Sequence, residues 1–252
     1  MSNIRVTYSG LISLASNLVS VITGLIFVII VTRSLTPEEF GVWGLISGLL
    51  AYAVIISPIV CYWSTRETAR GEESGKTAVS TNSMLSLLGV TIYLIISYFV
   101  ARQSNFDESV ILLAVILIPV IFLNDILIAI IRGWKTHILN YGLLSFEISK
   151  IVFVTIFIYF WDLGVTGAIF AVFVSYLPSI IILFMYSIPQ IKNKFNSEYV
   201  KKWFKLFWIP TYRQLPNTIL LTDVVIFSVI TGSVIGVAYF TAARTIGYLV
   251  DH

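Results

Sequence analysis

Long apolar stretches, separated by short polar segments, follow one another along the whole sequence. Seven are long enough to cross the ~30 Å hydrocarbon core of a bilayer, which takes roughly 20 helical residues. They cover residues 11–31, 41–63, 83–101, 110–131, 141–160, 164–187 and 206–231, and an eighth begins near residue 234. The pattern predicts an all-α integral membrane protein, a polytopic helix bundle.

Composition supports this fold class. Of the 252 residues, 58% are apolar and 12% are charged, whereas a soluble domain is about half apolar and about a quarter charged. The single cysteine, Cys61, excludes an internal disulfide and is expected to be a packing residue. The first apolar stretch is too long for a cleavable secretion signal and ends near Arg33, so we expect it to remain as a span.

The polar segments alternate in charge, and this alternation orients the chain. Two bases, Arg33 and Arg102, lie on one side, and eleven lie on the other: Arg5, Arg66, Arg70, Lys76, Arg132, Lys135, Lys192, Lys194, Lys201, Lys202 and Lys205. Because cytoplasmic loops collect Lys and Arg, the N-terminus is expected in the cytoplasm of a multi-pass protein of the cell membrane. Bases distributed this way report topology, so no nucleic acid is expected as a partner.

The basic segment 190–205 divides the predicted bundle. We expect a first transmembrane lobe of about six helices over residues 1–189, a cytoplasmic linker over 190–205, and the start of a second lobe over 206–252. Aromatic residues alternate with lysines in the linker. It is expected either to lie on the inner leaflet as an amphipathic helix or to be a solvated connection.

A weak repeat supports two halves. Residues 35–42 and 230–237 share Thr, Gly and Val at the same places, 195 positions apart, and each segment follows one span and opens the next. Many transporters are built from two similar halves. We therefore expect the chain to be part of a longer protein.

Six charged residues fall inside predicted spans: Asp125, Glu147, Lys150, Arg213, Asp223 and Arg244. Charges in a span cost several kcal/mol, so they usually face a bundle interior or an aqueous cavity. Glu147 and Lys150 stand three residues apart on one helical face, where they can neutralise each other. Asp125 is expected at a comparable depth, which allows a cluster of all three.

Arg213 lies between Pro210 and Pro216. The prolines can free backbone carbonyls toward a cavity that Arg213 faces, or Arg213 can extend to the inner headgroups. Asp223 and Arg244 lie deeper and are better candidates for the interior.

Two asparagines, Asn17 and Asn124, are expected to line a cavity or to bridge helices, and bridging is the commoner role. The two histidines, His137 and His252, lie outside the spans, and no metal-ligand spacing is present. We predict no catalytic residue, no metal and no enzyme.

Residues 32–70 carry the most specific motif. A basic residue ends the first span, a turn of the form L-T-P-E-E-F-G follows with Pro37, Glu38 and Gly41, and the second span leads to an exit with Arg66 and Arg70. This segment resembles the start of the polysaccharide or oligosaccharide flippases of the multidrug, oligosaccharidyl-lipid and polysaccharide exporter (MOP) superfamily. The resemblance is specific over about 40 residues.

The resemblance implies two lobes around a central cavity, of which this chain would supply the first and the beginning of the second. It implies movement of a lipid-linked oligosaccharide, a polyprenyl-pyrophosphate sugar, from the inner to the outer leaflet, with glycan-assembly proteins as partners. The cavity would bind the pyrophosphate through Lys150, Arg213 and Arg244. The three carboxylates in spans would bind a coupling proton or sodium ion, or release the substrate by pairing with the bases.

Two other functions remain open. A cation-coupled multidrug or small-molecule exporter of the same superfamily would favour carboxylates over bases in the cavity, whereas here the charges within spans are balanced. A membrane-embedded glycosyl or acyl transferase, or a polymerase, usually needs a large polar loop or a histidine in a span, and this chain has neither.

Overall fold

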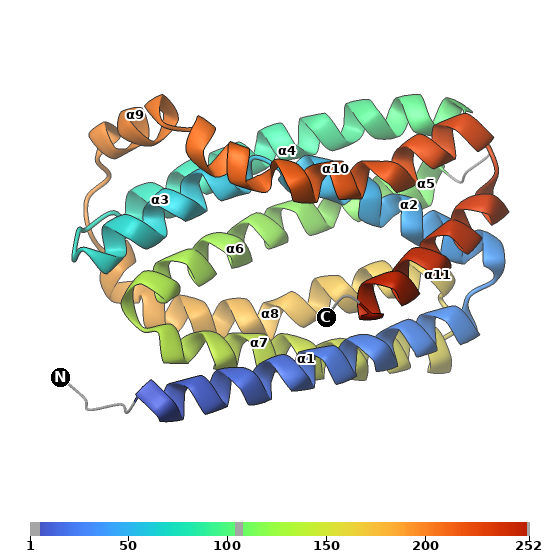
Figure 1. Cartoon of the computed structure of the whole chain (residues 1–252), viewed down its shortest axis with the longest axis horizontal. Coiled ribbons are helices and arrows are strands. Elements are labelled where there is room, and N and C mark those ends of the chain that lie inside the picture. The colour runs from blue at the N-terminus through green and yellow to red at the C-terminus, as the bar shows by residue number, and fades with distance from the viewer. Residues whose placement is uncertain (1–5, 104–107, 251–252) are drawn as a thin grey trace.

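The computed structural model describes residues 6–103 and 108–250, and the side chains of these except residues 6–9, 101–103, 215–221 and 245–250. Within these ranges the chain is helical, without strands (Figure 1). The α-helices are α1 (Val6–Ser34), α2 (Pro37–Val54), α3 (Ser57–Ala69), α4 (Gly75–Gln103), α5 (Glu108–Leu113), α6 (Leu117–Trp134), α7 (Leu139–Val154), α8 (Gly164–Ile191), α9 (Ser197–Lys205), α10 (Trp208–Thr231) and α11 (Val234–Val250).

The prediction of a multi-pass membrane protein is confirmed. Within the described residues, five helices are long and apolar enough to cross a membrane, and α2 with α3 adds a sixth if the bent pair is one span. Two spans are composite: a 3₁₀ turn, Ala114–Ile116, joins α5 to α6, and a π-helical turn, Thr155–Phe160, ends α7. In α10 and α11, the described apolar parts are the shorter segments Thr222–Thr231 and Val234–Arg244.

The second predicted span, residues 41–63, is wrong as a single straight helix. Its two parts, α2 and α3, are bent by 54° relative to each other. Pro58 stands at the first turn of α3, where its missing N–H and its ring prevent α2 from continuing. The bend aims α3 toward α6, against which it packs closely.

The helix ends gather at the two ends of the bundle, as alternating spans require. Figure 1 shows the start of α1 and α4, the end of α3 and α6, and all of α9 at one end. The loops predicted to be cytoplasmic therefore share this end, which we call the basic end. Arg5 and His252 lie outside the described residues. Which end faces the cytoplasm stays a prediction.

The core lies where α2, α6 and α8 meet. Leu45, Leu49, Phe122 and Ile126 are fully buried there. By contrast, α1 exposes many large apolar side chains, among them Leu14, which is 59% exposed. A helix with an apolar exposed face suits lipid or a neighbouring lobe.

The predicted repeat corresponds to two capped helix starts. Thr36 and Glu39 form a capping box at the start of α2, with hydrogen bonds of 3.2 and 2.9 Å. At the start of α11 the hydroxyl of Ser233 accepts a hydrogen bond from the N–H of Gly236 at 3.1 Å. The two helices pack against each other, so the similar segments meet in space.

The linker contains a helix, α9, which packs against α3 and α4. Its Trp203 is fully buried by the protein. The apolar face that could have rested on the leaflet thus covers the bundle, so a wholly solvated connection is excluded. The division into lobes stays a prediction, since α8 runs to Ile191 without a break at the expected boundary.

Candidate functional site

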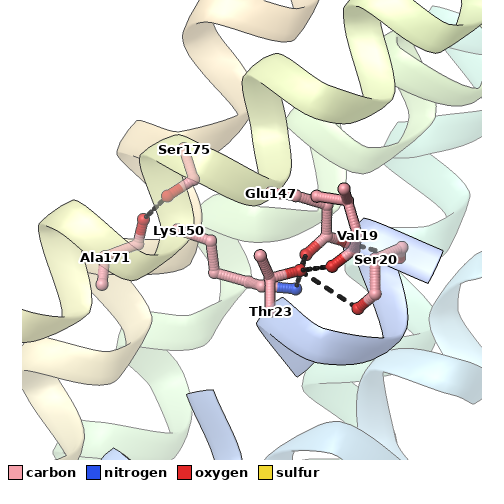
Figure 2. A network of polar contacts seen from close by, with 7 residues as sticks. All are labelled: Val19, Ser20, Thr23, Glu147, Lys150, Ala171 and Ser175. Carbon is pink, nitrogen blue, oxygen red and sulfur yellow. Dashed lines mark hydrogen bonds and ion pairs between the residues drawn. The ribbon is translucent and has the colours of Figure 1, made fainter. Parts of the chain in front are cut away.

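A buried ion pair within α7 is hydrogen-bonded to α1. The Nζ atom of Lys150 lies 2.6 Å from Oε2 of Glu147, and the two side chains are 13% and 6% exposed. The carboxylate also accepts hydrogen bonds from the hydroxyls of Ser20, at 3.0 Å, and Thr23, at 2.5 Å. Figure 2 shows both charged side chains extending from α7 toward these α1 hydroxyls. Neutralisation within one helix, one of the two roles predicted, is present.

Aromatic rings complete the surroundings of Lys150. Its Nζ lies 5.6 Å from the ring centre of Phe27 and 5.1 Å from that of Phe146. Ring faces attract a cation. The ammonium is thus held by one carboxylate and two rings in a place that water barely reaches.

Beside the pair lies a polar cavity of about 460 Å³ among α1, α6, α7 and α8. Asn17 and Asn124 both line it, as do Glu147 and Tyr176. Asn124 is buried and its Oδ1 accepts a hydrogen bond from Ser179 Oγ at 3.0 Å. Asn124 therefore both bridges α6 to α8 and faces a cavity, whereas Asn17 lies exposed on α1.

A second, larger cavity of about 740 Å³ opens between α3, α6 and α10. Three arginines line it, one from each helix: Arg66, Arg132 and Arg213. All three are exposed, and the guanidinium of Arg66 lies 4.8 Å from the ring centre of Tyr62. We call this space the arginine cavity. An anionic group entering it would meet three permanent cations.

Asp125 lines the arginine cavity. Its Oδ2 accepts a hydrogen bond from Ser57 Oγ at 3.3 Å. Asp125 is the neighbour of Asn124 in α6, yet the two side chains face different cavities. In the described contacts Asp125 bonds to Ser57 and Glu147 pairs with Lys150, so the cluster of all three stays a prediction.

The deepest charges of the second predicted lobe pair with each other. Arg244 Nη1 of α11 lies 2.9 Å from Asp223 Oδ1 of α10, and their side chains are 15% and 40% exposed. Arg244 lines a small apolar cavity of about 230 Å³ together with Trp43. The described residues thus do not bring Lys150, Arg213 and Arg244 into one cavity. Two of these cations are paired with carboxylates in separate places.

The turn that resembles the family motif begins α2 and brings this helix into contact with α11. Pro37 begins α2 and Glu38 is exposed. The backbone at Gly41 lies so close to the carbonyl of Val234 in α11 that a Cβ atom would clash. Gly164, with a φ of +56°, gives the same close approach to the Glu39 carboxylate.

The exit motif is divided between two places. Arg66 lines the arginine cavity. Arg70 caps the end of α3 and is exposed, and its Nη1 atom lies 3.9 Å from Oε2 of Glu67.

Several polar residues of these sites were not predicted. Arg132 was expected only to mark topology, yet it lines both cavities. Ser20, Thr23 and Ser57 bind the carboxylates, but single hydroxyls are common in spans, so nothing in the sequence distinguishes them. Glu67, which is 2% exposed, also belongs to this group. It stands in a polar segment with two further acids and three bases, so nothing in the sequence marks it as buried.

Comparison with known proteins identifies the fold. The chain superposes on a multidrug resistance MATE family transporter of the MOP superfamily in its inward-facing conformation, with a TM-score of 0.70 at 19% identity, over 91% of this chain and 58% of that one. The outward-facing conformation gives a TM-score of 0.64 at 22% identity, over 93% and 57%. A MATE in complex with Br-NRF gives a TM-score of 0.64 at 22% identity, over 98% of this chain and 61% of that one.

The chain has the fold of MATE transporters. It spans somewhat over half the length of the solved chains that it matches, as one lobe with the beginning of another would. No family model and no curated protein matches the sequence. The expected superfamily fold is thus confirmed at the level of structure, and the flippase subfamily is not.

Proposed function

We propose that the chain is the first part of a membrane exporter that carries amphiphilic molecules through the arginine cavity. The observation that supports it most is this cavity, large, open and polar, within a MATE-like bundle. The fold comparisons favour the cation-coupled exporter of small molecules over the flippase expected from the turn motif. An amphiphile fits because the cavity mixes charged and apolar lining, including Ile128 and Pro210.

The helices around this cavity support access from one end. The cavity lies toward the basic end, where α3 and α6 end and α10 begins (Figure 1). Toward the other end, α2 lies tightly on α11 at Gly41. A substrate would enter from the basic end and leave once α2 and α11 separate.

Coupling to a cation would use Glu147. Its carboxylate and the Ser20 and Thr23 hydroxyls form an oxygen-rich group that Lys150 now neutralises. A proton or sodium ion would replace Lys150 at the carboxylate. The freed ammonium would then alter how α1 packs on α7, since the hydrogen bonds from Ser20 and Thr23 to the carboxylate join these helices.

A specific observation favours a second candidate, the lipid-linked oligosaccharide flippase. Three arginines face one carboxylate in the arginine cavity, and guanidinium groups bind phosphate oxygens with paired hydrogen bonds. A polyprenyl-pyrophosphate sugar would place its pyrophosphate among Arg66, Arg132 and Arg213 and leave its lipid tail in the bilayer.

Transport by the full-length protein in proteoliposomes tests both candidates. Export of an anionic amphiphilic dye such as anilinonaphthalene sulfonate, dependent on a proton or sodium gradient and lost in Glu147→Gln, is expected of the small-molecule exporter. Flipping of a polyprenyl-pyrophosphate sugar, lost in Arg132→Gln, is expected of the flippase. Lys135→Gln is the matched control, because Lys135 lies over the Trp134 ring, outside the cavity lining. Transport of neither substrate would refute the proposal.

A further inference from the structure

Helix α9 is fastened to the bundle along its inner face. Trp203 is fully buried, and its ring stacks on Tyr199 with centres 5.8 Å apart. Before the helix, the side chain of Asn196 caps Glu198, while the backbone N–H of Asn196 donates to Thr77 Oγ1 of α4 at 2.9 Å. The rotation of α9 about its axis is therefore fixed.

The same face of α9 also forms an ion pair with α3. Lys202 Nζ of α9 lies 2.7 Å from Oε1 of Glu67 in α3, and the side chain of Glu67 is 2% exposed. The hydroxyl of Tyr199 donates to Glu72 Oε2 at 2.8 Å. A carboxylate as buried as Glu67 is costly unless a cation pairs with it. Arg70, at 3.9 Å, is too distant and too exposed to replace Lys202.

Each end of this ion pair is tied to one wall of the arginine cavity. Arg66 precedes Glu67 on α3 and lines the cavity. On the other side, residues 206–207 join α9 directly to α10, whose Arg213 lines the opposite wall. Holding Lys202 on Glu67 thus holds the start of α10 beside the end of α3.

We propose that α9 is a clasp that sets the width of the arginine cavity, with the Glu67–Lys202 pair as its fastening. While the pair is closed, α10 stays near α3 and the cavity is narrow at the basic end. When it separates, Glu67 is left without its cation, which draws the clasp shut again. The inference rests on the cavity geometry and not on which molecule the exporter carries.

Cys61 provides the test, because it is the single cysteine of the sequence and lines the arginine cavity. In the full-length protein, with other cysteines replaced, its labelling rate with a water-soluble maleimide reports how far the cavity opens. Lys202→Gln should raise the rate about 10-fold, since a hydrogen-bonded charge contributes about that factor to an equilibrium. Lys201→Gln removes the same charge from the exposed neighbouring position and should leave the rate unchanged.

Equal labelling rates in the two variants, whether raised or unaltered, would overturn the proposal, because a general charge effect would then suffice. If Lys202→Gln does not fold, Glu67→Gln breaks the same pair, keeps the shape of the buried side chain and should give the same increase. Unaltered labelling in a folded Glu67→Gln variant would also overturn it. The measurement needs no substrate, so its failure is distinct from a failure of the proposed function.

Discussion

Removing the cation of the buried pair should destabilise the protein more than removing both charges. In Lys150→Met the carboxylate of Glu147 stays buried with only the Ser20 and Thr23 hydroxyls as donors. Breaking a buried pair by removing one partner costs about 3 kcal/mol or more. In the full-length protein that corresponds to a fall in melting temperature of a few degrees.

The opposite single change, Glu147→Gln, should cost less. The amide oxygen still accepts one of the two hydroxyl hydrogen bonds, the other hydroxyl can accept from the amide NH2 group, and Lys150 keeps the rings of Phe27 and Phe146. The double variant has no unpaired charge, so its stability should lie within about 1 kcal/mol of the unaltered protein.

Thermal unfolding of the full-length protein in detergent, followed as a double-mutant cycle, measures the coupling between the two residues. Lys201→Met, at an exposed lysine, controls for the loss of one positive charge. Additive effects of the two single changes would refute the reasoning, because they would mean that Glu147 and Lys150 do not depend on each other.

Three further outcomes follow from the structure. Thr36→Ala removes the capping box of α2 and should lower stability by about 1 kcal/mol in the same unfolding assay. Gly41→Ala should be clearly destabilising because its Cβ would clash with α11, whereas Gly24→Ala, with open space around it, should not lower the melting temperature. The hydrogen bond to the Glu72 carboxylate raises the pKa of Tyr199 to about 12. The contribution of this hydrogen bond to docking α9 should be complete below pH ~10 and lost as the pH rises through about 12. Ultraviolet titration should therefore show one tyrosine that ionises at a higher pH than the others, and this signal should be absent in Tyr199→Phe.

Which features could be predicted from the sequence depends on their range along the chain. The spans and their alternating ends follow from apolar length and loop charge, which are local properties, and the Glu147–Lys150 pair follows from their spacing of three on one helix. The bend at Pro58 could not be predicted from the sequence. Proline removes one hydrogen bond wherever it stands, and the packing of α3 on α6 decides how far the helix turns.

The three-dimensional placement of the charges could not be predicted. Asn124 and Asp125 are neighbours in the sequence, yet they face two different cavities, since adjacent residues of a helix point about 100° apart. Arg66, Arg132 and Arg213 lie far apart in the sequence and meet only because α3, α6 and α10 do.

The sequence by itself determined that this chain is a multi-pass helical membrane protein, because a helix that crosses the bilayer must be long and apolar, and each span shows this as an apolar stretch. It also indicated the fold, through a turn whose Thr36 and Glu39 form a local capping box. The tertiary structure alone decided which charges pair between helices, which line a cavity, and that α9 packs on the bundle. Those outcomes depend on how helices rotate and pack against one another, and that information is not local to any one of them.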